Sequence, residues 1–369
     1  MRLAVTTAGS RARRLIEAAQ DATVIAVFAR SLYLRDASGR IACFGGPGLG
    51  EGPLNALCVS WPESATVAAN SAANWQAGVL RLGGVELDAA QAQPWRPTSS
   101  MAWDGPTLKC GLVRLAVIPA RGLGRLIPLL VPQTAASGPS PPPGPMSARE
   151  VARTRLGGGE EGTPSRSDGE GEVVLCGPHS SDPPHPLPGS GGLRPRNEDW
   201  ARAPSPPDRR RASRAPKGGE GYGSVAAQLE HALNTSLLTL AAWLREPAGE
   251  PPATVATLIG LGSGLTPAGD DALGGALIAL RVFGRAALAD RLAEWLLPRA
   301  RTGTSDISHA HLAAAAEGEG AAALHDTLTA LANDDASLAE GVARLDRIGH
   351  SSGWDALAGA VAALVSLAG

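Results

Sequence analysis

The stretch Gly260-Leu-Gly-Ser-Gly-Leu-Thr-Pro-Ala-Gly-Asp-Asp-Ala-Leu-Gly-Gly275 places a glycine-rich loop directly before a run of apolar residues. Its glycines allow the backbone to turn sharply and to expose N–H groups. Thr266 is a favourable N-cap residue and Pro267 suits the first helical position, so we expect a buried helix that includes residues 272–280. A loop that leads into a helix N-terminus is a ready anion-binding site, because its free N–H donors and the helix dipole favour negative charge.

Two adjacent carboxylates, Asp270 and Asp271, complicate this prediction because they put negative charge where an anion would bind. They could bind Mg²⁺, act as a general base, or stabilise the helix N-terminus electrostatically. Capping explains one of them well. The second points in another direction around the helix and needs a reason of its own.

A second segment resembles the first. Gly349-His-Ser-Ser-Gly-Trp-Asp355 leads into residues 355–364, which match residues 271–280 at seven of ten positions. In both helices the aspartate shares a stripe with small side chains, which would let the helices approach to the low end of the usual separation of about 8–10 Å. We expect the two glycine loops to meet at one shared site, with the alternative that the likeness is chance in a chain rich in Ala, Leu and Gly. The stripes contain Asp271, Gly274, Gly275 and Ile278 in the first helix, and Asp355, Ala358, Gly359 and Ala362 in the second.

These two segments supply the candidate site residues. For proton transfer we consider His350, Asp270 and Asp271, of which the two aspartates are also the candidate metal ligands. The short hydroxyls could simply cap helices, and His350 could be held by backbone contacts alone. The candidates for binding a substrate or another anion are Gly262, Ser263, Gly264, Thr266, Gly269, Ser351, Ser352, Gly353, Asp355, Thr304 and Ser305.

The chain divides into three parts by composition. Residues 1–131 contain many short β-branched and apolar runs with turn signals, which predict a small β barrel or sandwich with strands that include 112–118 and 126–131. Residues 132–221 contain most of the prolines of the chain, and we predict a disordered insertion there. Residues 222–369 show apolar residues at helical spacing. The expected fold class is α+β, with a β-rich N-terminal domain followed by an α-helical domain.

Composition also excludes several classes of protein. The chain has 369 residues and a formal net charge of −2, which gives no overall attraction to nucleic acid or to an anionic membrane. Lys109 and Lys217 are the only lysines, and neither lies in a P-loop motif. The N-terminus lacks the continuous apolar segment of a signal peptide, and no apolar run is long enough to span a bilayer. We therefore expect a cytoplasmic protein.

The motifs GLGSGLTPAGDD at residues 260–271 and GHSSG at residues 349–353 resemble those of the AllH-like family. Members typically carry G-L-G-x-G-L-T-P-x-G-D-D before a helix and G-H-S-S-G near the C-terminus. The likeness is strong over residues 223–369 and weak over residues 22–131, and the insertion departs from the family's compact connection.

The resemblance implies one subunit of an oxamate carbamoyltransferase of anaerobic allantoin breakdown, acting with other protein subunits. Such an assembly converts oxalurate and phosphate to oxamate and carbamoyl phosphate, so small anionic ligands would be the partners. Carboxylates beside anions would also call for a cation, either Mg²⁺ or an arginine such as Arg301. The alternatives are a non-catalytic scaffold or ligand-binding regulatory subunit, and a metal-dependent hydrolase of an amide or ureido compound.

Overall fold

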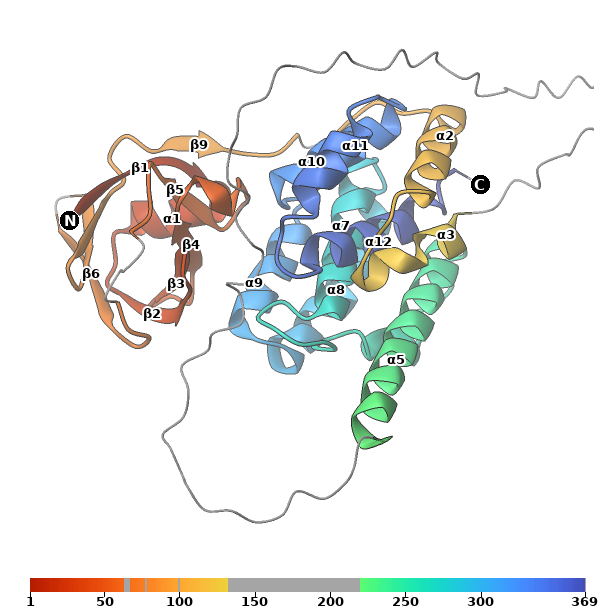
Figure 1. Cartoon of the computed structure of the whole chain (residues 1–369), viewed down its shortest axis with the longest axis horizontal. Helices are drawn as coiled ribbons and strands as arrows, with labels where there is room; N and C mark the ends of the chain where they lie inside the picture. The colour runs from red at the N-terminus through yellow and green to blue at the C-terminus, as the bar shows by residue number, and fades with distance from the viewer. Residues whose placement is uncertain (63–66, 77, 99, 132–219, 369) are drawn as a thin grey trace, which may run out of the picture. The chain divides into compact units, whose positions relative to one another are not determined.

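The computed structural model describes residues 1–62, 67–76, 78–98, 100–131 and 220–368. Its N-terminal part is a β-barrel of eight strands in the order β5-β4-β3-β2-β6-β7-β8-β1, closed by antiparallel pairing of β1 with β5 (Figure 1). A ninth strand, β9, pairs with the end of β1. The strands are β1 (Arg2–Gly9), β2 (Ala22–Val27), β3 (Ser31–Asp36), β4 (Ile41–Gly45), β5 (Asn55–Cys58), β6 (Ala72–Gln76), β7 (Val79–Leu82), β8 (Val85–Asp88) and β9 (Gln93–Trp95).

Alternation of side chains along the strands fills the barrel. In β1, Leu3 and Val5 are buried while their neighbours are exposed, as the two-residue period of a strand requires. Helix α1 (Ser10–Ala18) adds the fully buried Leu15 to the same core. The prediction of a β-rich N-terminal part is therefore confirmed, and of its two versions the structure shows the barrel.

The remaining described residues form a helical region, which confirms the expected fold class. The helical character predicted after residue 222 is confirmed in the described residues. The helices are α2 (Gly105–Ala116), α3 (Ile127–Leu130), α5 (Glu220–Arg245), α6 (Ala253–Ala256), α7 (Ala268–Val282), α8 (Ala286–Gly303), α9 (Asp306–Ala315), α10 (Ala322–Ala332), α11 (Leu338–Leu345) and α12 (Ser352–Leu364), and the 3-10 turns are η1 (Pro47–Leu49) and η2 (Gly122–Leu126).

The strands predicted at 112–118 and 126–131 are wrong, because both segments are largely helical. Asp104 caps α2 by accepting a hydrogen bond from the Thr107 amide at 2.9 Å. Along α2 the buried Leu108, Leu112 and Leu115 follow a helical period, which outweighs the β-branched residues that suggested a strand. Both segments contribute side chains to the core of the helical region.

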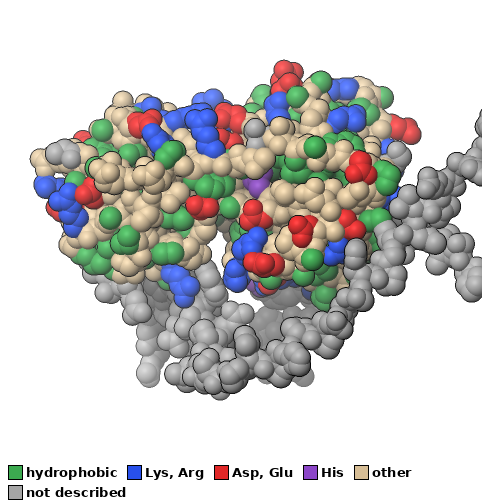
Figure 2. Space-filling view, turned by 90° about the horizontal axis from the view of Figure 1, so that it is seen from above, with side chains coloured by type: hydrophobic (Ala, Val, Ile, Leu, Met, Phe, Trp, Pro, Cys, Tyr) green, Lys and Arg blue, Asp and Glu red, His purple; other side chains and the backbone are tan. Residues whose placement is uncertain are grey.

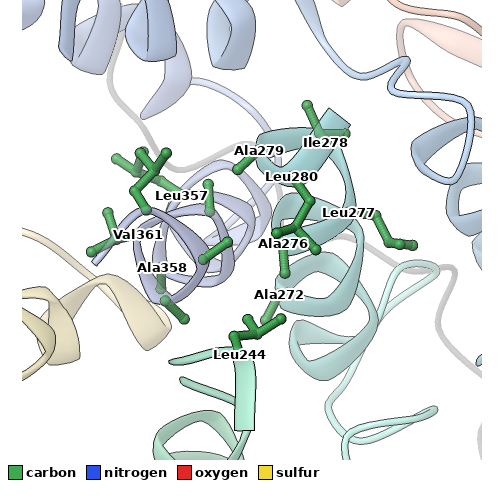
Figure 3. Close-up of a cluster of buried hydrophobic side chains, with 14 of the residues drawn as sticks. Leu244, Ala272, Ala276, Leu277, Ile278, Ala279, Leu280, Leu357, Ala358 and Val361 are labelled. Atoms are coloured by element: carbon green, nitrogen blue, oxygen red, sulfur yellow. The ribbon is translucent and has the colours of Figure 1, made fainter. Parts of the chain in front are cut away.

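Helices α7 and α12 lie side by side in the middle of this core (Figure 3). The close-up shows Ala272, Ala276 and Leu280 of α7 beside Leu357, Ala358 and Val361 of α12, with Leu244 of α5 below them. All of these side chains are buried. Helices α7 and α12, which follow the two glycine loops, thus form the centre of the core, and their packing fixes the position of each loop.

The barrel and the helical region belong to one compact unit. No described helix combines the length and apolar character needed to cross a membrane. Acidic and basic side chains are interspersed on the face seen in Figure 2, in keeping with the small net charge. The predicted disordered insertion lies outside the described residues, except that α5 already begins at Glu220.

Candidate functional site

The first glycine loop enters α7 differently from the prediction. The helix begins at Ala268, and Pro267, in an extended conformation, occupies the N-cap position without a side-chain capping bond. Thr266 therefore does not cap the helix. Its hydroxyl lies 3.2 Å from the hydroxyl of Ser352 at the start of α12, so the first contact of this residue is with the second loop.

Asp270 is buried and has three hydrogen-bond donors. Its Oδ1 accepts from the Gly260 amide at 2.9 Å, and its Oδ2 accepts from the Ser308 hydroxyl at 2.6 Å and from the Thr304 hydroxyl. These donors come from the glycine loop and from the junction of α8 and α9. Asp270 thus ties the loop to the neighbouring helices. Thr304 was a candidate anion-binding residue, whereas Ser308 was not a candidate because it lies in no motif.

Asp271 has different surroundings. It is partly buried, and its Oδ2 is buried without a hydrogen-bond partner among the described residues. Burial raises the pKa of its carboxyl well above the ordinary value, and the charges of Asp355 and Asp270 raise it further. The hydroxyls of Ser352 and Thr266 favour the charged form and oppose this shift. Asp271 is therefore a carboxyl biased toward its neutral form, at the place where the loops meet.

Asp355 occupies the corresponding position in α12, but its hydrogen bonds are satisfied. Its Oδ1 accepts from the Leu123 amide at 2.6 Å, and its Oδ2 accepts from the Ser351 hydroxyl at 2.8 Å. Gly122, with φ of +53°, lets η2 come this close, because a Cβ there would lie 2.3 Å from Asp355 Oδ1. Burial raises the pKa of Asp355, against the effects of the Leu123 amide, Ser351 and His350.

The predicted close approach of the two helices is confirmed. A Cβ at Gly275 would lie 1.8 Å from the carbonyl oxygen of Ala356, and a Cβ at Gly359 would lie 1.8 Å from that of Ala272. Gly275 lies four residues after Asp271 and contacts Ala356, the residue after Asp355. Gly359 lies four residues after Asp355 and contacts Ala272, the residue after Asp271. The contact is therefore reciprocal, as in a pair of helices related by approximate two-fold symmetry.

The loops repeat the same contacts. A Cβ at Gly269 would lie 2.0 Å from the Leu258 carbonyl oxygen, and one at Gly353 would lie 2.1 Å from the Leu345 carbonyl oxygen. The Gly269 amide donates to the carbonyl of Leu261, three residues after Leu258, and the Gly353 amide donates to the carbonyl three residues after Leu345. The two glycines that were candidate anion ligands thus serve close packing, and their amides already have acceptors.

The tip of the first loop is more open. Ser263 and Gly264 are exposed, and a Cβ at Gly264 would meet nothing within 4 Å. At Gly262, with φ of +131°, a Cβ would lie 2.6 Å from the Ala268 amide nitrogen. Glycine at position 262 therefore lets the loop pack closely against the start of α7.

The histidines separate into two kinds. His350 is exposed in the turn before α12, close enough to Asp355 for its charge to lower the pKa of that carboxyl. His311 and His325 lie inside helices, and burial lowers the pKa of each to about 4. They are neutral at physiological pH, as expected of histidines in the packing of the helices. His350 remains a prediction for proton transfer.

Other hydroxyls position the loop. Ser305 caps α9 by accepting from the Ser308 amide at 3.0 Å, and its hydroxyl donates to the Leu265 carbonyl at 2.9 Å. Leu265 and the barrel residue Tyr33 both pack against the small hydrophobic cluster that contains Ile307. Burial raises the pKa of Tyr33, with smaller contributions from Cys43 and from the charge of Asp271. Sequence reasoning missed Tyr33, because no pattern in the strand connects it to the distant loops.

The donor set does not fit a metal ion shared by Asp270 and Asp271. Both oxygens of Asp270 already accept hydrogen bonds, and its neighbours differ from those of Asp271. Within the described part of the chain, no three or more His, Cys, Asp or Glu side chains gather as a metal-binding group. We therefore derive no chemical step through Mg²⁺.

Comparison with protein-family models matches residues 258–364 to the family described as oxamate carbamoyltransferase subunit AllH. No curated protein and no solved structure matches the chain. The matched range starts at Leu258, includes both glycine loops with α7 and α12, and leaves the barrel outside. The family resemblance predicted from the two motifs is thus confirmed over residues 258–364.

Proposed function

We propose that this chain is a subunit of a carbamoyltransferase-like enzyme that acts with phosphate on a small ureido carboxylate, such as oxalurate. The family match indicates a subunit that works with other protein subunits in a complex. The observation that carries the proposal is the carboxyl of Asp271, whose buried Oδ2 has no hydrogen-bond partner among the described residues. It lies at the junction of the two glycine loops, inside the family-matched range.

The reaction requires a proton for the leaving nitrogen. An oxygen of hydrogen phosphate attacks the terminal ureido carbon, the bond from this carbon to the internal nitrogen breaks, and oxamate leaves with carbamoyl phosphate as the second product. The departing nitrogen takes up one proton, and the phosphate hydroxyl gives up one. A neutral Asp271 can give the first proton and regain the second, so the carboxyl ends the cycle as it began.

The loops supply the anion-binding groups of this proposal. The hydroxyls of Thr266 and Ser352 are donors beside Asp271, and the exposed Ser263 and Gly264 form the tip of the same loop. Phosphate, the substrate carboxylate and the developing oxyanion all accept hydrogen bonds from such groups. A neutral Asp271 also removes one of the negative charges that would repel these anions. His350 is the further candidate for moving a proton.

Turnover of oxalurate and phosphate by the assembled complex tests this role. Asp271→Asn keeps the size of the side chain but cannot transfer a proton, so we expect carbamoyl phosphate formation to fall by about 10²–10⁴-fold. Circular dichroism and a thermal melt check that the variant is folded. Full activity of the D271N complex would remove Asp271 from the reaction.

A non-catalytic scaffold is the second candidate, since Asp270, Asp355, Gly269 and Gly353 all make internal contacts that hold the helices together. Isothermal titration with phosphate, carbamoyl phosphate and oxamate, with and without Mg²⁺, distinguishes the two. Absence of binding both to the chain and to its complex would favour the scaffold. Binding that needs Mg²⁺ would instead favour a metal-dependent amide or ureido hydrolase.

A further inference from the structure

The two loop–helix units differ in one chemical respect. Asp355 has a protein donor on each carboxyl oxygen, namely the Leu123 amide and the Ser351 hydroxyl. The buried Oδ2 of Asp271 has none among the described residues. A buried carboxyl oxygen without a partner costs free energy unless a ligand supplies the missing hydrogen bond. Both carboxyl oxygens of Asp355 are thus bonded to protein donors, whereas the Oδ2 of Asp271 lacks a donor among the described residues.

The chemistry of a neutral carboxyl limits what can complete it. Such a group presents one O–H donor and one carbonyl acceptor side by side. A planar amide or ureido group presents the matching carbonyl acceptor and N–H donor along one edge. A carboxylate offers acceptors only, and an ammonium offers donors only. Of these three groups, only the amide-type edge forms both hydrogen bonds at once.

We propose that Asp271 recognises the amide edge of the ligand through a pair of hydrogen bonds, with Thr266 and Ser352 beside it. The inference rests on the proposed function and adds to it the group that this site selects. In this pair the O–H of neutral Asp271 donates to the ligand carbonyl oxygen, and its other oxygen accepts from the ligand N–H. The contact is therefore one of recognition, and it holds the carboxyl next to the ureido group.

Oxamate and oxalate provide a matched pair of probes, because they differ by an amide group in place of a carboxylate. A site built to bond an amide N–H rejects an analogue that lacks it, since its own polar group is then left unpaired. We expect oxamate to bind the full-length chain at least about tenfold more tightly than oxalate at pH 7, measured by isothermal titration.

Two variants at position 271 separate recognition from proton transfer. Asp271→Asn keeps a donor and an acceptor side by side, so oxamate affinity is expected to stay within about threefold of the wild type. Asp271→Leu keeps the approximate volume without either group, and oxamate affinity is expected to fall at least about tenfold. Asp326→Asn, which removes an exposed carboxyl paired with Arg344 on another helix, serves as the control and should change neither.

Equal affinity for oxamate and oxalate, absence of oxamate binding, or unchanged binding by a folded D271L variant would overturn the inference. Failure of the proposed function gives a different result, namely selective oxamate binding without carbamoyl phosphate formation by the complex. If the wild-type complex forms carbamoyl phosphate but D271L binds oxamate as tightly as the wild type, the proposed function stands and the role of Asp271 in recognition is rejected.

Discussion

The two loop–helix units around α7 and α12 share their backbone contacts and differ in their carboxyls. Both use one glycine packed against a backbone carbonyl of the preceding segment and a second glycine packed against the opposite helix. Asp355 is nevertheless bonded to η2, whereas Asp271 faces the other loop with one oxygen unpaired. The comparison teaches that one copy of a repeated element can hold the fold while the other remains available to a ligand.

The largest expected effect on stability comes from Gly275 and Gly359, which each pack against the backbone of the opposite helix. Gly359→Ala places a Cβ 1.8 Å from the backbone oxygen of Ala272, and backbone cannot move aside as a flexible side chain can. We expect the free energy of unfolding to fall by about 3 kcal/mol or more, measured by chemical denaturation.

Gly274→Ala is the matched control for this prediction, because it adds the same methyl group to the central helix pair. Its Cβ would meet Ala315 and Leu312 at 3.7 and 3.8 Å, which is ordinary contact. The better helix propensity of alanine should then stabilise the protein by up to about 1 kcal/mol. If both variants are equally stable, the close approach of α7 and α12 is incorrect.

The next effect concerns the two aspartates themselves. Asp355→Ala leaves the buried Leu123 amide without its acceptor, and we expect a loss of about 1–3 kcal/mol in the free energy of unfolding. Asp271→Ala also removes the partner of the Ser352 and Thr266 hydroxyls, but its Oδ2 has no described protein donor and burial disfavours its charge, so its cost should be below about 1 kcal/mol. Denaturation of both variants at pH 7 gives the comparison, and a larger loss at position 271 would contradict it.

The pH dependence of stability should also depend on position 271. The pKa of Asp271 is raised in the folded protein, so the folded state binds more protons than the unfolded state above the unfolded pKa of about 3.9. The contribution of Asp271 is complete below that pH and is lost as pH rises through the folded pKa, by at most about 1.4 kcal/mol per pH unit. The difference in unfolding free energy between wild type and D271N, followed from pH 4 upward, should show this slope. A flat difference would mean that Asp271 titrates normally.

The smallest effect lies at the residue before each aspartate. Asp270 has three donors in the first unit, whereas its counterpart Trp354 donates from its ring nitrogen to Asp346 at 2.6 Å in the second. Asp346 is half exposed, so Asp346→Ala should cost only about 0.5–1.5 kcal/mol in a denaturation experiment. Ser308→Ala, which removes a donor to the buried Asp270, should cost more. A larger loss of stability in Asp346→Ala than in Ser308→Ala would show that the contact of Trp354 with Asp346 is the stronger one.

Prediction from sequence succeeded where the pattern is local and periodic. The helical character after residue 222 and the small stripes of α7 and α12 follow from spacing along the chain. It failed for α2, where β-branched residues concealed the helical period of Leu108, Leu112 and Leu115. It also placed Thr266 as a cap, because the residue type suits that position and the contact with Ser352 joins residues far apart in sequence.

The sequence alone determined that two glycine-rich loops precede two similar helices, each with an aspartate at its start, and that small residues would let the helices meet. Only the tertiary structure decided that these aspartates differ. The Leu123 amide that satisfies Asp355 comes from a segment more than 200 residues away, as its separation of 232 positions shows. Burial and hydrogen bonding depend on which segments pack together, so the same residue in the same local motif became a structural anchor in one unit and an unpaired acid in the other.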